Sequence, residues 1–160
     1  MTDLDSLEAR VTALEDVESI KMVKAKYWRC IDRKLWDELG ECFSEDAITD
    51  YGPGKQLKGN NLVVEFFRNK SNARIPTAIQ IHHGHNPEIR LISSHGASGI
   101  WQIFNYRIDT ESNMGTRIGG FYTDTYLKEK GEWKISSSVM NYLFWEDFDR
   151  EKQGLNWIPS

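Results

Sequence analysis

The feature that most constrains the fold of this chain is a change in its hydrophobic pattern near Ile75. Before that point apolar residues recur at the helical spacing of three and four, and after it they alternate as in strands. We place four β-rich runs at about 77–92, 97–108, 116–129 and 132–145, separated by the turn-like segments SSHGASG, DTESNMG and KEKGE. Helices followed by long antiparallel strands predict an α+β fold, with a cone-shaped, curved antiparallel sheet wrapped around N-terminal helices.

Three helices are expected ahead of these strands. The first is long and amphipathic, covers residues 1–30, and carries an apolar stripe that includes Leu7, Val11, Ile20 and Tyr27. Shorter helices fit RKLWDELGECF and NNLVVEFFRNK, and DAITDY alternates briefly before the turn GPG. The first β-rich run is expected to bend at HNPE, because Pro87 cannot donate to a strand ladder. Residues 146–160 are expected to form a polar C-terminal tail that frays or docks on a neighbour.

Length and charge narrow the classes of function. A chain of 160 residues is long enough for one domain with a full core, so we expect a single domain over residues 1–160. The net charge is −4 and the basic residues are dispersed, which argues against nucleic acid as a partner. The N-terminal segment lacks the order of a signal peptide, and no apolar run reaches about 18 residues. We therefore expect a cytoplasmic protein without a membrane partner.

The chain is rich in aromatic residues, with seven Phe, six Trp and six Tyr. Such a set can line a large apolar cavity, or it can fill the core and an oligomer interface. The two cysteines, Cys30 and Cys42, lie in helical patterns. A small buried apolar role is expected for both of them rather than a disulfide.

Three of the four histidines stand together in the stretch IQIHHGHNPEIRL. Because side chains alternate along a strand, His82 should lie on one face and His83 and His85 on the other. A metal site needs a third and usually a fourth ligand, whereas the remaining histidine, His95, falls in an expected turn. The sequence therefore predicts no metal site and an activity that does not require one.

Tyr27 and Asp32 lie at the end of the first helix. They are five residues apart, about 140° around an ideal helix, so they converge only if Asp32 lies at or beyond the helix end. Asp32 precedes the second helix and could serve as its N-cap, or it could have a functional role. Tyr27 could be a core residue with a satisfied hydroxyl or a catalytic group.

At these residues the chain resembles a known family. YWRCIDRKLWDEL, IQIHHGHNPEI and GGFYTDTYLKEKGEWKIS are similar to segments of the SnoaL-like branch of the nuclear transport factor 2-like superfamily. Within that branch the pattern is most similar to the bile acid 7α-dehydratases, also similar to the hexachlorocyclohexane dehydrochlorinases, and more distantly to the scytalone dehydratases. The resemblance covers nearly the whole chain.

The resemblance implies a cofactor-free lyase that acts on a small hydrophobic substrate, cyclic or steroid-like, and a homotrimer. It implies that Asp32 and His82 form an acid-base dyad, with Tyr27 as a further catalytic group. Where the bile acid enzymes carry a strand carboxylate and a last-strand Arg, this chain has Asn105 and Tyr142. The residues expected to contact the substrate are Tyr51, Trp101, Asn105, Phe121 and Tyr142.

The implied chemistry suits these side chains. A neutral imidazole oriented by a carboxylate can take a proton from carbon next to a carbonyl group, and a tyrosine hydroxyl can hydrogen-bond the developing enolate. Two other classes stay open, because the same cone hosts isomerases and cyclases as well as proteins that only bind small molecules. Loss of water from the substrate would distinguish a dehydratase from an isomerase.

Overall fold

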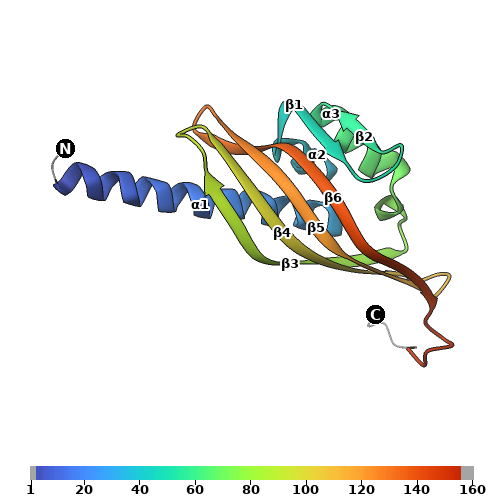
Figure 1. Ribbon diagram of the computed structural model, residues 1–160. Helices are drawn as coiled ribbons and strands as arrows, with labels where there is room; N and C mark the ends of the chain where they lie inside the picture. Colours follow the sequence, from blue (N-terminus) through green and yellow to red (C-terminus); the bar gives the residue numbers. More distant parts are fainter. Residues whose placement is uncertain (1–2, 156–160) are drawn as a thin grey trace.

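The computed structural model describes residues 3–155, and its helices and strands follow the predicted order (Figure 1). The helical part comprises α1 (Asp3–Asp32), α2 (Trp36–Glu41), α3 (Asn60–Glu65), a π-helical turn (Phe66–Lys70) and a 3₁₀ turn (Asn72–Arg74). The strands are β1 (Phe43–Asp50), β2 (Gln56–Lys58), β3 (Ala78–Leu91), β4 (Gly96–Asp109), β5 (Met114–Glu129) and β6 (Glu132–Asp149). The predicted change from helix to strand near Ile75 is thus confirmed.

The strands form one curved sheet in the order β2-β1-β6-β5-β4-β3. The four long strands make the expected antiparallel meander, but β1 pairs with β6 in parallel. No tight hairpin joins β1 to β6, so nothing imposes an antiparallel direction on this pair. The second helix is shorter than expected, because β1 already begins at Phe43. β6 also continues to Asp149, so the expected tail starts as strand, and its last residues, 156–160, lie outside the described part.

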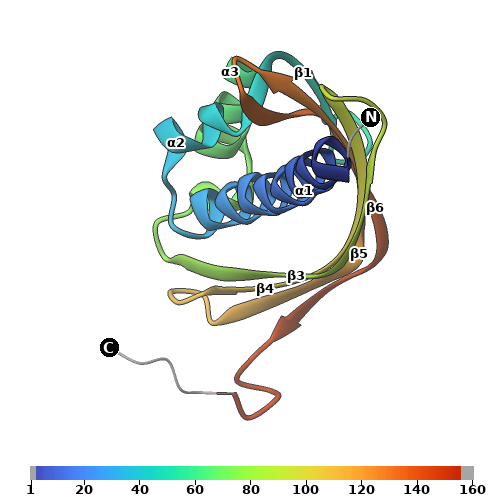
Figure 2. The same cartoon turned by 90° about the vertical axis from the view of Figure 1, so that its left-hand side faces the viewer.

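The sheet curls around α1, which lies along its concave side (Figure 2). Register shifts mark bulges in β3 at His85 to Glu88 and in the β5–β6 pair at Gly119 to Gly120, and such bulges bend strands. The predicted bend at HNPE is therefore confirmed. The N-terminal turns of α1 extend beyond the sheet, and Leu7 and Leu14 are exposed there (Figure 1). In the described range, α1 and the other helices lack the length or the apolar character needed to span a membrane.

A glycine allows the last turns of α1 to lie against β3. The Trp28 ring packs over Gly84, where an added Cβ would stand only 1.9 Å from the ring. A side chain at this position would displace the Trp28 ring, so Gly84 lets the end of α1 pack close to His82, its neighbour on the same face. Cys30 and Cys42 are buried and free, as expected.

The core also holds an ion pair that the sequence pattern did not reveal. Lys24 Nζ lies 2.7 Å from Asp124 Oδ2, and both side chains are fully buried. The Lys24 ammonium also lies 3.8 Å from the centre of the Tyr122 ring, and the Tyr126 hydroxyl donates to Asp124 at 2.7 Å. Burial lowers the pKa of Lys24, and the charge of Asp124 opposes this shift. Removing either partner would leave the other charge in an apolar surrounding.

Candidate active site

Asp32 and His82 meet where the end of α1 lies against β3. The Asp32 carboxylate makes two contacts with the same residue: Oδ1 lies 2.6 Å from His82 Nδ1, and Oδ2 accepts the His82 backbone N–H at 3.0 Å. Both side chains are largely buried. The N-cap of α2 is Leu35, without a side-chain cap, so Asp32 does not cap that helix. Of the two expected roles for Asp32, the observed contacts fit the pairing with His82.

Two further bonds hold the end of α1 on β3. The Lys34 ammonium donates to the Ala78 carbonyl at 2.6 Å, and the Gln80 side-chain amide donates to the Ile31 carbonyl at 3.2 Å. Lys34 adopts a left-handed backbone conformation, with φ of 56°, and thereby turns the chain away from the helix. The Asp32–His82 pair is therefore flanked by contacts that join the end of α1 and the turn after it to β3 and that do not involve its own atoms.

The Asp32 contact assigns the tautomer of His82. A carboxylate can only accept, so the proton of the neutral imidazole sits on Nδ1, and Nε2 keeps its lone pair. His82 also lines a cavity, so Nε2 is the ring nitrogen available to a bound molecule. A neutral imidazole held in this way is equipped to act as a base, and the adjacent carboxylate stabilises the imidazolium that would form.

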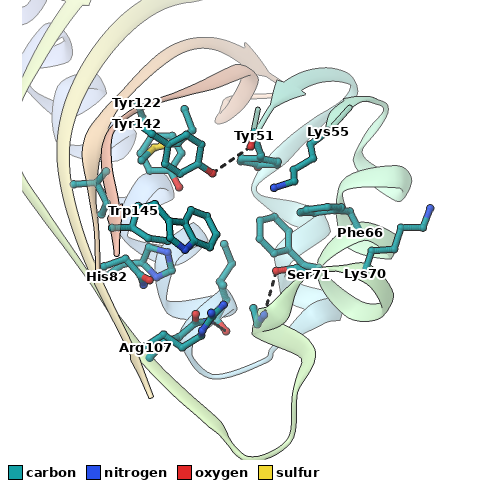
Figure 3. A pocket seen from close by; sticks show the side chains of 18 residues that line it. Tyr51, Lys55, Phe66, Lys70, Ser71, His82, Arg107, Tyr122, Tyr142 and Trp145 are labelled. Carbon is teal, nitrogen blue, oxygen red and sulfur yellow. Dashed lines mark hydrogen bonds between the residues drawn. The ribbon is translucent and has the colours of Figure 1, made fainter. Parts of the chain in front are cut away.

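The cavity has a volume of about 300 Å³ and lies between the inward faces of the long strands and the π-helical turn (Figure 3). Four of the residues predicted for the site line it: His82, Tyr51, Asn105 and Tyr142. Its walls are mainly apolar and aromatic. Of the two roles open to the aromatic residues, some of them line this cavity and others fill the core.

A cluster of tyrosines forms the inner wall. The Tyr27 hydroxyl donates to the Tyr51 hydroxyl at 3.2 Å, and the Tyr142 hydroxyl donates to the Tyr51 carbonyl at 3.2 Å (Figure 3). Burial raises the pKa of Tyr27, Tyr51 and Tyr122 above the usual tyrosine range. These hydroxyls therefore stay protonated near neutral pH, where they can donate hydrogen bonds but cannot act as bases.

Four of the predicted site residues do not line the cavity. One is Asp32, which contacts the lining residue His82 at 2.6 Å. Tyr27 is fully buried, and its hydroxyl bonds to that of the lining residue Tyr51. Trp101 is buried too, and its indole N–H donates to Tyr126 at 2.8 Å. Phe121 lies on the convex face of the sheet and is exposed, because its neighbour Tyr122 takes the inward position.

Several lining residues were not predicted. Arg107 could have been found, because it lies two residues after Asn105 and so shares its face of β4. Trp145 could not have been found in this way. It lies three residues after Tyr142, and the β6 bulge is what puts both side chains on the same side of the strand. Nothing in the sequence marked Phe66, in the π-helical turn, as a residue that lines the cavity.

The other two clustered histidines lie outside this cavity. The rings of His83 and His85 stack with centroids 6.2 Å apart on the exposed face of β3, as alternation predicted. Within residues 3–155, no group of three or more His, Cys, Asp or Glu side chains is placed to hold a metal ion.

Comparison with known proteins identifies the family of this chain. Residues 12–139 match the family model of the SnoaL-like domain. The γ-hexachlorocyclohexane dehydrochlorinase of Sphingobium indicum is 26% identical over 153 residues, which cover 89% of this chain and 87% of that protein.

Two solved structures have a similar fold. The hexachlorocyclohexane dehydrochlorinase of Novosphingobium barchaimii superposes with a TM-score of 0.75 at 21% identity, covering 99% of this chain and 100% of that chain. A candidate scytalone dehydratase from Novosphingobium aromaticivorans gives a TM-score of 0.75 at 21% identity, covering 87% of this chain and 91% of that chain. The family match extends over most of the sequence, and the chain therefore belongs to the SnoaL-like domain family, within the nuclear transport factor 2-like superfamily.

Proposed function

We propose that this protein is a cofactor-free lyase that eliminates water from a small, hydrophobic, cyclic carbonyl compound. The observation that carries the proposal is the contact between Asp32 and His82 at the wall of an aromatic cavity. The similarity to a dehydrochlorinase, an enzyme that removes a proton and a leaving group from its substrate, supports a lyase. We favour water over chloride as the group that is lost, because a tyrosine cluster offers hydroxyl donors beside the cavity.

The proposed reaction assigns a role to each group. His82 Nε2 takes the proton from carbon next to the carbonyl group, while Asp32 stabilises the resulting imidazolium. Tyr51 donates a hydrogen bond to the carbonyl oxygen as enolate character develops, and Tyr27 donates to Tyr51 from behind. The carbon–oxygen bond of the hydroxyl group then breaks as the carbon–carbon double bond forms. The imidazolium returns its proton to the departing hydroxide, so that one water is lost.

Tyr27 is therefore proposed as a positioning residue. Its hydroxyl occupies one acceptor site on Tyr51 and leaves the Tyr51 proton free to point at a bound molecule. A hydrogen bond received from behind also polarises the Tyr51 hydroxyl, which strengthens it as a donor. Asn105 and Tyr142 line the same cavity and are proposed to contact the substrate.

The test is product analysis with bicyclic β-hydroxy ketones in deuterated water, comparing the wild-type protein with His82→Gln. The expected result is a product lighter by one water, with formation lost in His82→Gln. An isomerase would instead give a product that has lost no water and is heavier than the substrate only by the deuterium that it has taken up. Binding of these ketones without any exchange or loss of water, and equally in His82→Gln, would leave a binding protein and overturn the proposal.

We also propose that the protein is a homotrimer, associated through the convex face of the sheet. This face carries exposed apolar side chains from four neighbouring strands, namely Ile81, Phe104, Phe121 and Phe144. The protruding turns of α1 add exposed leucines. Apolar surface of this kind on a small protein is typical of an interface with another chain.

A further inference from the structure

The charged side chains that line the cavity are all basic. Among the described residues that line it, Lys55, Lys70 and Arg107 carry positive charge, and none is an aspartate or glutamate. The chain as a whole has 24 acidic against 20 basic residues, so the cavity departs from the overall balance. A wall of this composition favours a bound molecule with negative charge.

Lys55 is unpaired at the upper edge of the cavity. It lies in the turn between β1 and β2, and it forms no ion pair with any residue of the described range. Its ammonium is 5.8 Å from the centre of the Trp145 ring, and Figure 3 shows it pointing into the cavity above Phe66. Nothing in the described structure therefore neutralises a positive charge that faces the binding space.

Arg107 approaches the cavity from β4 and keeps most of its donors. Its guanidinium donates from Nη2 to Thr116 Oγ1 at 2.8 Å, and a guanidinium has five N–H groups. Burial lowers the pKa of Arg107, and the charges of Asp147 and Asp109 oppose that shift. Asp147 accepts from Thr116 at 2.6 Å and Asp109 from Thr77 at 2.8 Å, so neither forms an ion pair with Arg107 within the described residues.

Lys70 differs from these two cations. Its ammonium lies 3.5 Å from a carboxylate oxygen of Glu65, and its side chain points away from the cavity in Figure 3. It is thus a natural control: a lysine of the same rim whose charge is paired and directed outward.

We infer that the substrate is a flat apolar acid whose negative charge is stabilised by the two cations Lys55 and Arg107, while its ring system lies against the aromatic wall near Phe66. The rings of Tyr51 and Phe66 are stacked at 11° with centroids 5.8 Å apart, so they present a flat apolar edge beside Lys55. The inference rests on the proposed function, since it names the substrate class of the same site. It concerns binding, however, and does not depend on the base.

The experiment compares two ligands of matched shape, 1-naphthaleneacetate and 1-naphthaleneacetamide, by isothermal titration calorimetry with the full chain. The acid should bind at least about tenfold more tightly than the neutral amide, since hydrogen bonds to charged groups contribute that much. Lys55→Gln and Arg107→Gln should each reduce this preference, and the double variant should abolish it. Lys70→Gln should leave it unchanged. Circular dichroism verifies that each variant is folded, and Arg107→Lys, which keeps the charge, should retain part of the preference.

His82→Gln separates this inference from the proposed function. The variant should lose turnover but keep the preference for the acid, so an inactive protein that still selects the acid would support the binding site alone. Equal binding of acid and amide, failure of both to bind at millimolar concentration, or an effect of Lys70→Gln as large as that of Lys55→Gln would overturn the inference. A preference for the acid that persists in the folded double variant would do the same.

Discussion

Asp32 holds His82 by two atoms, because one carboxylate oxygen meets the ring at 2.6 Å and the other accepts the backbone N–H of the same residue at 3.0 Å. The backbone contact fixes the carboxylate in place, and the ring contact fixes the tautomer. A residue that only ended a helix would need neither. A structural role and a catalytic role of Asp32 therefore predict opposite effects of its substitution on turnover.

Asp32→Asn tests these forecasts. The amide keeps the shape and one acceptor, so the free energy of unfolding should fall by no more than about 1–2 kcal/mol. Turnover should fall by about 10²-fold or more, because the charge that stabilises the imidazolium is lost and the amide can present a donor to Nδ1. Steady-state kinetics and urea denaturation measure the two effects. Asp46→Asn, at an exposed position on β1, is the matched control and should change neither. Near wild-type turnover in a folded Asp32→Asn protein would end the dyad hypothesis.

The alternation of side chains along a strand correctly predicted the orientation of those site residues that lie in regular strand. His82 was assigned to the face opposite His83 and His85 because β3 is regular at that point. The partner of His82 could be inferred only from the family resemblance, because the contact depends on where α1 stops. That point depends on packing between Trp28 and Gly84, which lie far apart in the sequence.

The parts of the site that sequence reasoning missed follow irregular backbone. The β6 bulge turns both Tyr142 and Trp145 toward the cavity, which no period of two predicts. Phe121 was expected in the site as one of many aromatics, yet the strict alternation of β5 turns it outward and Tyr122 inward. The buried Lys24 and Asp124 each look like surface residues in the sequence, because their pairing depends on α1 crossing the sheet.

The tyrosine pair predicts a graded effect of two similar substitutions. Tyr51→Phe removes the proposed donor to the substrate carbonyl and should lower turnover by about 10²-fold. Tyr27→Phe removes only the bond behind it, and we expect a loss of less than about tenfold. The double variant should resemble Tyr51→Phe alone, since Tyr27 acts through Tyr51. A larger loss in Tyr27→Phe than in Tyr51→Phe, measured on folded proteins, would contradict this order.

The buried ion pair predicts non-additive stability. Lys24→Met leaves the Asp124 carboxylate unpaired in the core, which should lower the free energy of unfolding by about 3–5 kcal/mol. Adding Asp124→Asn removes that charge while keeping an acceptor for the Tyr126 hydroxyl, so the double variant should recover most of the loss. Urea denaturation of the four proteins gives the coupling. Two independent, additive losses would show that the pair does not act as a unit.

The convex face predicts the oligomeric state. Light scattering should give a mass near three times the monomer mass of 18.6 kDa. Phe104→Lys places a charge in the middle of the apolar face and should yield monomers. Ile92→Lys is the control, because Ile92 is even more exposed but follows β3 in the turn to β4. A wild-type protein that runs as a clean monomer would refute the trimer.

The buried tyrosines predict a loss of stability at alkaline pH. Burial raises the pKa of Tyr27, Tyr51, Tyr122, Tyr126 and Tyr142 above the ordinary value of 10.0. A group whose folded-state pKa is raised contributes stability that is complete below its unfolded pKa and is lost as the pH rises toward its folded pKa.

The free energy of unfolding should therefore fall steeply above about pH 10, by up to about 1.4 kcal/mol per pH unit for each tyrosine that ionises only on unfolding. Lys24 acts in the opposite direction, because a lowered pKa makes stability rise with pH up to the ordinary lysine pKa of 10.5. This single lysine is outweighed by the five tyrosines. Urea denaturation at a series of pH values gives the slope, and the ultraviolet absorbance of tyrosinate reports ionisation. Both signals should change together as the protein unfolds, and Tyr126→Phe should make the fall less steep. Ionisation of more than one of the six tyrosines near pH 10 in a protein that remains folded would contradict the burial of these hydroxyls.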